Sequence, residues 1–186
     1  MRPAHYVNIE IPGNEKGGGP SRPVVAGAIL RVLHGAFRRY PGKFALALPG
    51  KENSLFACIR VFSPTRGDLD LLVDAVVDNP AIRDYGRIGY PRAVPEKFDG
   101  PWKRYSRFRI PTRKADRDPD HALRTRRIAQ ADENKLPFFI LSSASSGQRF
   151  GLYVEIGPAA DHQGECKPDS YGLSVTTRPF AVPDLP

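Results

Sequence analysis

The N-terminal half of the chain alternates between strand-like and helix-like patterns of apolar residues. Apolar and polar side chains alternate from His5 to Ile11, which is typical of a strand. Residues 24–40 repeat apolar positions at helical spacing, and Pro41-Gly42 ends that pattern. Later patterns predict strands at 44–48 and 55–62, a helix at 69–77 that stops near Asn79-Pro80, and a weak strand at 88–94 that Pro91 interrupts.

This order of elements is strand, helix, strand, strand, helix, strand. It predicts an α+β fold that begins with a split βαβ, or ferredoxin-like, domain. A Pro- and charge-rich stretch at 91–101 predicts a boundary, so we expect domains at 1–95 and 96–186. Because this fold serves many unrelated functions, it does not by itself indicate one.

The C-terminal half begins with another alternating segment, in which Tyr105, Arg107 and Arg109 share one face. Asp118-Pro119 predicts the start of a helix that runs to about residue 133. That helix lacks an apolar stripe, so we expect it to dock on a charged ligand. Strands are predicted at 136–141 and 150–156, on either side of a serine-rich turn.

The basic charge of the chain is concentrated in one block. The 186 residues carry a net charge of +8, yet residues 101–128 hold ten Lys and Arg against three Asp, while the rest holds 18 basic and 17 acidic residues. Arginine forks match phosphate oxygens and guanine edges, so the block indicates a polyanionic ligand. The alternative is a charged helix face that simply contacts solvent.

Several classes of protein are excluded or disfavoured. No apolar run approaches the roughly 18 residues that cross a bilayer, and residues 1–10 lack the pattern of a secretory signal. Two cysteines cannot form a disulfide framework, so a cytoplasmic location is expected. None of the four histidines has zinc-protease or zinc-finger spacing, and we expect no metal and no cofactor.

Two features are candidates for chemistry. His34 lies away from the apolar stripe of its predicted helix, on the side that carries Arg31 and Arg38. It is either a surface histidine or a general acid or base. The serine-rich turn at 142–147 is either a plain hairpin turn or a contact for a ribose or phosphate.

Longer stretches of the sequence resemble a known family. The stretches are Leu136-Pro137-Phe138, residues 143–150 (SASSGQRF), Gly157-Pro158 and residues 171–174 (YGLS). They resemble the repeat-RNA endoribonuclease of type I-F (Csy) CRISPR systems. Three earlier pairs agree in the same order: His5-Tyr6, Leu33-His34 and Ser106-Arg107.

The resemblance implies a ferredoxin-like domain followed by a domain with an arginine-rich helix. It implies an enzyme that binds the hairpin of the CRISPR repeat and cuts once at the 3′ foot of the stem. The cut would need no metal, because the upstream ribose 2′-OH attacks the scissile phosphate. The enzyme would then stay on the crRNA 3′ handle with subunits of the type I-F surveillance complex.

Residue roles follow from the same resemblance. His34 would transfer the proton, Ser143 would hold the reacting ribose, and Tyr171 would orient the histidine. Phe150 would stack on the lowest base pair, and Arg107 would read a guanine. The expected RNA contacts are Arg107, Arg109, Arg113, Lys114, Arg117, Arg124, Arg126, Arg127, Ser145 and Phe150.

The chain also departs from the family pattern. Arg109 stands where the family has a glutamine, the helix has fewer arginines, and its connection to Leu136 is shorter. These departures affect which RNA is read more than the chemistry. A non-catalytic RNA-binding subunit and a basic protein-interaction adaptor remain open alternatives. An RRM is disfavoured because residues 55–62 lack its base-stacking aromatics.

Overall fold

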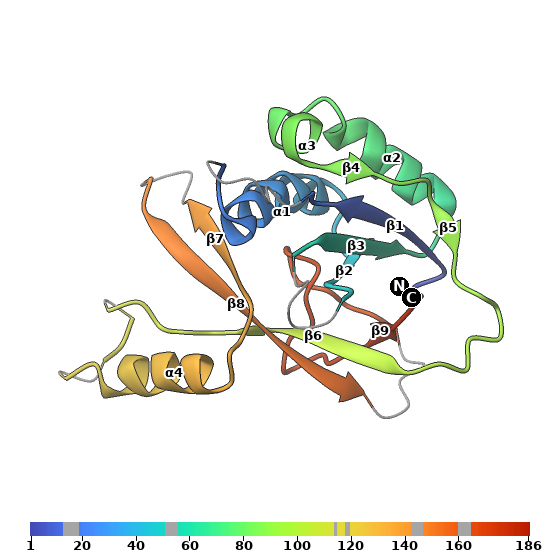
Figure 1. Ribbon diagram of the computed structural model, residues 1–186. Helices are drawn as coiled ribbons and strands as arrows, with labels where there is room; N and C mark the ends of the chain where they lie inside the picture. Colours follow the sequence, from blue (N-terminus) through green and yellow to red (C-terminus); the bar gives the residue numbers. More distant parts are fainter. Residues whose placement is uncertain (13–18, 51–55, 114, 118–119, 143–146, 160–164) are drawn as a thin grey trace.

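The computed structural model describes residues 1–12, 19–50, 56–113, 115–117, 120–142, 147–159 and 165–186 (Figure 1). Within these residues the chain forms two antiparallel sheets with four helices, which confirms the α+β class. The division into two domains near residue 95 stays a prediction.

Strand β1 (His5–Glu10) is central in the first sheet. It pairs with β3 (Cys58–Ser63), which pairs with β2 (Ala45–Ala47). Along its other edge β1 pairs with β4 (Arg87–Ile88) and β5 (Arg92–Ala93). The strand order along this sheet is β2-β3-β1-β4, with β5 beside β4 on the same edge of β1, and the ferredoxin-like architecture stays a prediction. The weak strand predicted at 88–94 is two short strands, because Pro91 has no N–H to donate to the ladder.

Helices α1 (Arg22–Arg39) and α2 (Arg66–Val76) contact each other, and their buried residues join the apolar side chains of β1 in one core. Helix α3 (Pro80–Tyr85) was not predicted. Asn79-Pro80 begins this helix, although the sequence pattern indicated only that the preceding helix ends there. The Asn79 Oδ1 accepts a hydrogen bond from Ala81 N at 3.1 Å, and proline suits the first helical position.

A buried arginine joins the first sheet to the last residues of the chain. Arg60 is only 3% exposed and donates to Oδ1 of Asn8, its cross-strand neighbour, at 2.8 Å. Its other nitrogens donate to the carbonyls of Leu185 at 2.7 Å and Pro186 at 2.9 Å. Its guanidinium lies 4.7 Å from the centre of the Tyr6 ring. These contacts satisfy the buried charge and hold residues 185–186 against the sheet.

The second sheet has the order β7-β8-β6-β9, and all its pairs are antiparallel. Its strands are β6 (Trp102–Phe108), β7 (Phe138–Ser142), β8 (Arg149–Ala159) and β9 (Val182–Pro183). Helix α1 also packs on β7, and its buried residues share one core with the strands of the first sheet, so it lies against both sheets (Figure 1). A Cβ at Gly27 would lie 2.0 Å from the Ile140 carbonyl oxygen, so this packing depends on the missing side chain.

Helix α4 (Ala122–Glu133) begins later than the sequence predicted. Asp118 and Pro119 lie outside the described residues, and the residue before the helix is His121, in the left-handed conformation with φ 53°. The carboxylate of Asp116 accepts a hydrogen bond from Arg124 N at 2.8 Å and so serves the first turn. Among the residues of α4 only Ala131 is buried, as expected for a helix without an apolar stripe.

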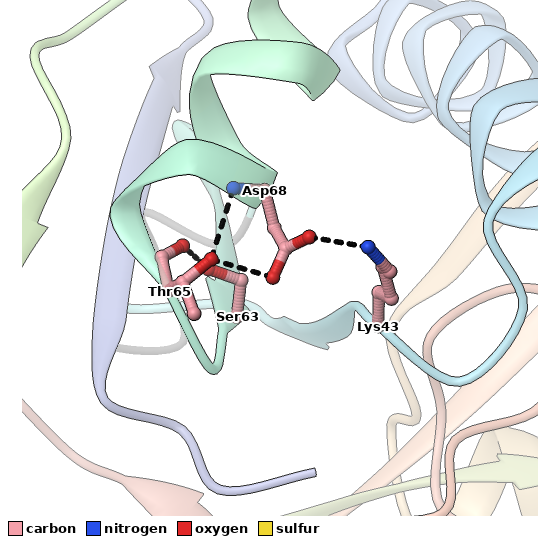
Figure 2. A network of polar contacts seen from close by, with 4 residues as sticks. All are labelled: Lys43, Ser63, Thr65 and Asp68. Atoms are coloured by element: carbon pink, nitrogen blue, oxygen red, sulfur yellow. Dashed lines mark hydrogen bonds and ion pairs between the residues drawn. The ribbon is translucent and has the colours of Figure 1, made fainter.

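A polar network fixes the start of α2 (Figure 2). The Thr65 hydroxyl accepts from Asp68 N at 3.1 Å and donates to Asp68 Oδ2 at 2.7 Å, while Lys43 Nζ lies 2.6 Å from Oδ1. The Ser63 hydroxyl donates to the Thr65 carbonyl. Burial alone would raise the pKa of Asp68, but the hydrogen bonds from Lys43 and Thr65 and the charge of Lys43 hold that pKa below its ordinary value.

Replacing Gly27 with alanine tests the close packing of α1 on β7. The added Cβ forces the helix away from Ile140, so Gly27→Ala is expected to lower the free energy of unfolding by about 1–3 kcal/mol. Gly35 is the matched control, because it lies on the same helix with nothing within 4 Å of an added Cβ. Gly35→Ala should raise stability by about 0.5–1 kcal/mol. Equal effects of the two variants in denaturant titrations would contradict the packing.

The Asp68 network makes stability depend on pH. Because the pKa of Asp68 is lower in the folded chain, its contribution is present at neutral pH and lost as the pH falls below the ordinary value of 3.8. Asp68→Asn is expected to cost about 1 kcal/mol at pH 7, and the difference from wild type should shrink in acid. Asp70→Asn is the control, since its pair with Arg66 is exposed and weak. Thermal unfolding at several pH values measures the stability of wild type and of the two variants.

Candidate functional site

His34 is held by the chain in one orientation. Its Nδ1 lies 2.7 Å from the carbonyl oxygen of Ser170, and a carbonyl only accepts, so Nδ1 carries a proton. The His34 ring stacks on Tyr171, with ring centres 4.2 Å apart and an interplanar angle of 15°. In the neutral ring Nε2 is therefore free of a proton. This nitrogen forms no hydrogen bond within the described residues.

The segment 169–173 positions both partners of His34. Asp169 Oδ1 accepts from the backbone nitrogens of Tyr171 at 2.8 Å and Leu173 at 3.0 Å. Gly172 has φ +78°, and its carbonyl accepts from Leu46 N at 2.8 Å. A Cβ at Gly172 would lie 2.9 Å from the Phe37 ring. The turn is thus fastened between α1 and β2, and it presents Tyr171 and the Ser170 carbonyl to His34.

Arg107 extends this arrangement from the second sheet. Its guanidinium lies 5.5 Å from the centre of the Tyr171 ring, a favourable cation–π geometry. His34, Tyr171 and Arg107 therefore form a row of three neighbouring side chains from α1, the turn and β6. Tyr105, two residues earlier on β6, is 3% exposed and belongs to the hydrophobic core.

Two arginines of α4 hold the helix against the segment that precedes it in the chain. Arg124 donates to the Pro111 carbonyl at 2.6 Å, and Arg127 donates to the Arg109 carbonyl at 3.2 Å. Arg127 also lies 3.7 Å from the centre of the Phe108 ring. Arg124 and Arg127 are three residues apart and share one face of α4, and these contacts turn that face toward the segment after β6.

The remaining predicted contacts differ in exposure. The side chains of Arg109, Arg113, Arg117 and Arg126 are exposed, and Phe150 is 38% exposed. Three predicted residues, Lys114, Ser143 and Ser145, lie outside the described residues. The RNA-binding roles of all these residues therefore stay predictions.

Other chemistries find little support in the described part of the chain. Burial raises the pKa of the thiols of Cys58 and Cys166 to about 11 in each case, so neither is a thiolate nucleophile at neutral pH. No three His, Cys, Asp or Glu side chains among the described residues lie close enough together to hold a metal ion. No described helix has the length and apolar character needed to cross a bilayer.

Sequence reasoning missed Asp169 and the carbonyl of Ser170. A backbone carbonyl leaves no trace in the sequence. Asp169 did leave a signal, because an aspartate two residues before Tyr171 and three before Gly172 is typical of an Asx turn. That turn could have been predicted, whereas its contact with α1 depends on the tertiary fold.

The fold and the site define a basic α+β protein with a histidine-centred site beside an arginine-bearing segment. A protein-family model described as CRISPR-associated protein (Cas_Csy4) matches residues 6–184. The chain therefore belongs to the Csy4 family of type I-F CRISPR-associated endoribonucleases and is a repeat-RNA processing protein. This confirms the family that the sequence resembled. Curated protein sequences yielded no match.

Two glycine variants separate backbone strain from misplacement of the site. Gly172 and Gly42 both have positive φ, +78° and +76°, but only Gly172 has neighbours within 4 Å of an added Cβ. Each alanine should cost about 1–2 kcal/mol of unfolding free energy from strain. Gly172→Ala should in addition displace Tyr171, which NMR detects as a changed ring shift of His34. An unchanged His34 shift in Gly172→Ala would contradict the role of the turn.

Proposed function

We propose that the chain cuts the CRISPR repeat RNA at the 3′ foot of its hairpin by attack of a ribose 2′-OH, without a metal ion. The observation that carries this proposal is the restraint of His34. A hydrogen bond to the Ser170 carbonyl and a stack on Tyr171 leave Nε2 as the free proton-transfer atom of a fixed ring.

In this reaction the 2′-oxygen forms a bond to phosphorus and the bond from phosphorus to the 5′-oxygen breaks. The 2′-OH loses a proton and the departing 5′-oxygen gains one, which leaves a 2′,3′-cyclic phosphate and a 5′-OH. Nε2 of neutral His34 accepts the first proton, or Nε2 of the charged ring donates the second. A cleavage rate that rises with pH assigns the base role, and one that falls assigns the acid role.

The other residues of the proposal bind the RNA. Ser143 holds the reacting ribose, and Phe150 stacks on the lowest base pair of the stem. Arg107 reads a guanine near the stem foot, where a bidentate contact is specific. The row of Arg107, Tyr171 and His34 supports these assignments, because one aromatic ring lies between the arginine proposed to read a base and the histidine proposed to transfer the proton.

We propose that residues 1–95 carry the catalytic histidine and residues 96–186 bind the stem. The excess charge of segment 101–128 supports this division.

The enzyme then keeps the cut product as the crRNA 3′ handle and joins the subunits of the type I-F surveillance complex. Retention is checked by measuring how slowly the cut hairpin dissociates, and fast release would contradict it.

The reaction is tested with repeat RNA in EDTA. Wild-type protein is expected to cut once, and His34→Ala should slow cleavage by about 10²–10⁴-fold, because a positioned proton-transfer group contributes that much. Binding should change little, since His34 carries no part of the basic block. A 2′-deoxy ribose at the cut should abolish cleavage while the RNA still binds.

His5→Gln is the matched control, because His5 lies on β1 and belongs neither to the row nor to the basic block. It should cut at the wild-type rate. RNA that stays intact with wild-type protein in EDTA would overturn the metal-independent mechanism. If the wild-type protein and His34→Ala bind repeat RNA with equal affinity and neither cuts it, the result would favour a non-catalytic RNA-binding subunit.

A further inference from the structure

A small basic pocket lies between α1 and strands β7 and β8, and its lining residue Arg31 is one helical turn before His34. Four residues of α1 line it, Val24, Gly27, Ala28 and Arg31, and the β7–β8 hairpin contributes Ile140, Ser142 and Arg149. Its volume is about 110 Å³. Pockets that enclose whole drug-sized ligands are several times larger, about 300–1,000 Å³. This size suits a single phosphate group with part of its sugar.

The polar groups of the pocket favour an anion. Arg31 and Arg149 can only donate hydrogen bonds, Ser142 can donate one, and no lining residue is acidic. Both arginines are exposed, and neither forms a hydrogen bond or ion pair within the described residues. Two guanidiniums without a counter-ion, beside a hydroxyl, match the oxygens of a phosphodiester.

The pocket and His34 lie on one face of α1. Residues 24, 27, 28, 31 and 34 follow helical spacing, so Arg31 is one turn before His34. The turn that holds Tyr171 contacts the other end of the helix, at Phe37. His34 therefore lies between the Tyr171–Arg107 side and the pocket.

We propose that this pocket binds a phosphate of the RNA strand on the 3′ side of the cut. The proposal rests on the proposed function, which places the stem over Arg107 and the basic segment. A strand that leaves the stem and passes His34 continues along α1 toward Arg31 and Arg149. The pocket thereby holds the departing strand in line with the scissile phosphate before cleavage, and the cut product no longer reaches it.

Two RNAs test the assignment. One is an uncleavable repeat with a 2′-deoxy ribose at the cut and several nucleotides beyond it, and the other ends at the cut. A double variant, Arg31→Gln with Arg149→Gln, should bind the extended RNA about tenfold more weakly. The slope of log affinity against log salt should fall by about 0.7 for each arginine–phosphate pair that the substitutions remove. Affinity for the RNA that ends at the cut should not change.

Arg83→Gln is the control for loss of charge, because Arg83 is exposed on α3 and paired with Asp84. Arg83→Gln should leave the affinity for the extended RNA and for the RNA that ends at the cut unchanged. Photo-crosslinking from the first nucleotide beyond the cut provides a measurement on wild-type protein and should label α1 or the β7–β8 hairpin.

If the double variant loses the same affinity for both RNAs, the pocket contacts the stem, and the proposal is overturned. No loss for either RNA, with crosslinks elsewhere, would also overturn it. The proposed function fails separately, if the wild-type protein binds repeat RNA without cutting it. The comparison of the two RNAs still decides the role of the pocket in that case.

Discussion

The close packing of α1 on β7 at Gly27 places the helix that carries His34 directly against the second sheet. No side chain separates the helix from the Ile140 carbonyl, so α1 lies directly on β7 while its buried residues share a core with the first sheet. One face of the helix then carries His34 along the junction between them. The turn at 169–173 contacts α1 at His34, and β7 packs on the same helix at Gly27, although these segments are far apart in the sequence. A larger residue at this one position would force α1 away from β7.

The four residues of the YGLS stretch each have a distinct physical task. Tyr171 stacks on His34, and Gly172 supplies the positive φ and the absent Cβ that let the turn lie against Phe37. Leu173 is fully buried in the core. Ser174 is buried as well, and its hydroxyl accepts from Phe180 N at 3.1 Å. The stretch thus combines one residue of the site with three that hold it in place.

The arginines of the C-terminal half have two kinds of role. Arg124 and Arg127 bind backbone carbonyls and an aromatic ring of their own chain, which fixes a helix that has almost no apolar face. Arg109, Arg113, Arg117 and Arg126 remain exposed. A charge count along the sequence cannot separate these roles, because both use the same side chain. Arg124 and Arg127 therefore hold the helix in place, and their contacts with RNA stay predictions.

The sequence by itself determined the α+β class, the order of strands and helices as far as α2, the basic block and the family. These features depend on local periodicity and on residues that are close in the sequence. Short elements were less predictable: Asn79-Pro80 suits a helix start as well as a stop, and the left-handed His121 begins α4 after the predicted cap. Only the tertiary structure showed how His34 is held, because the Ser170 carbonyl and the Tyr171 ring come from a turn that is far from His34 in the sequence. Such contacts depend on how closely helices and sheets pack, and a linear pattern does not record that distance.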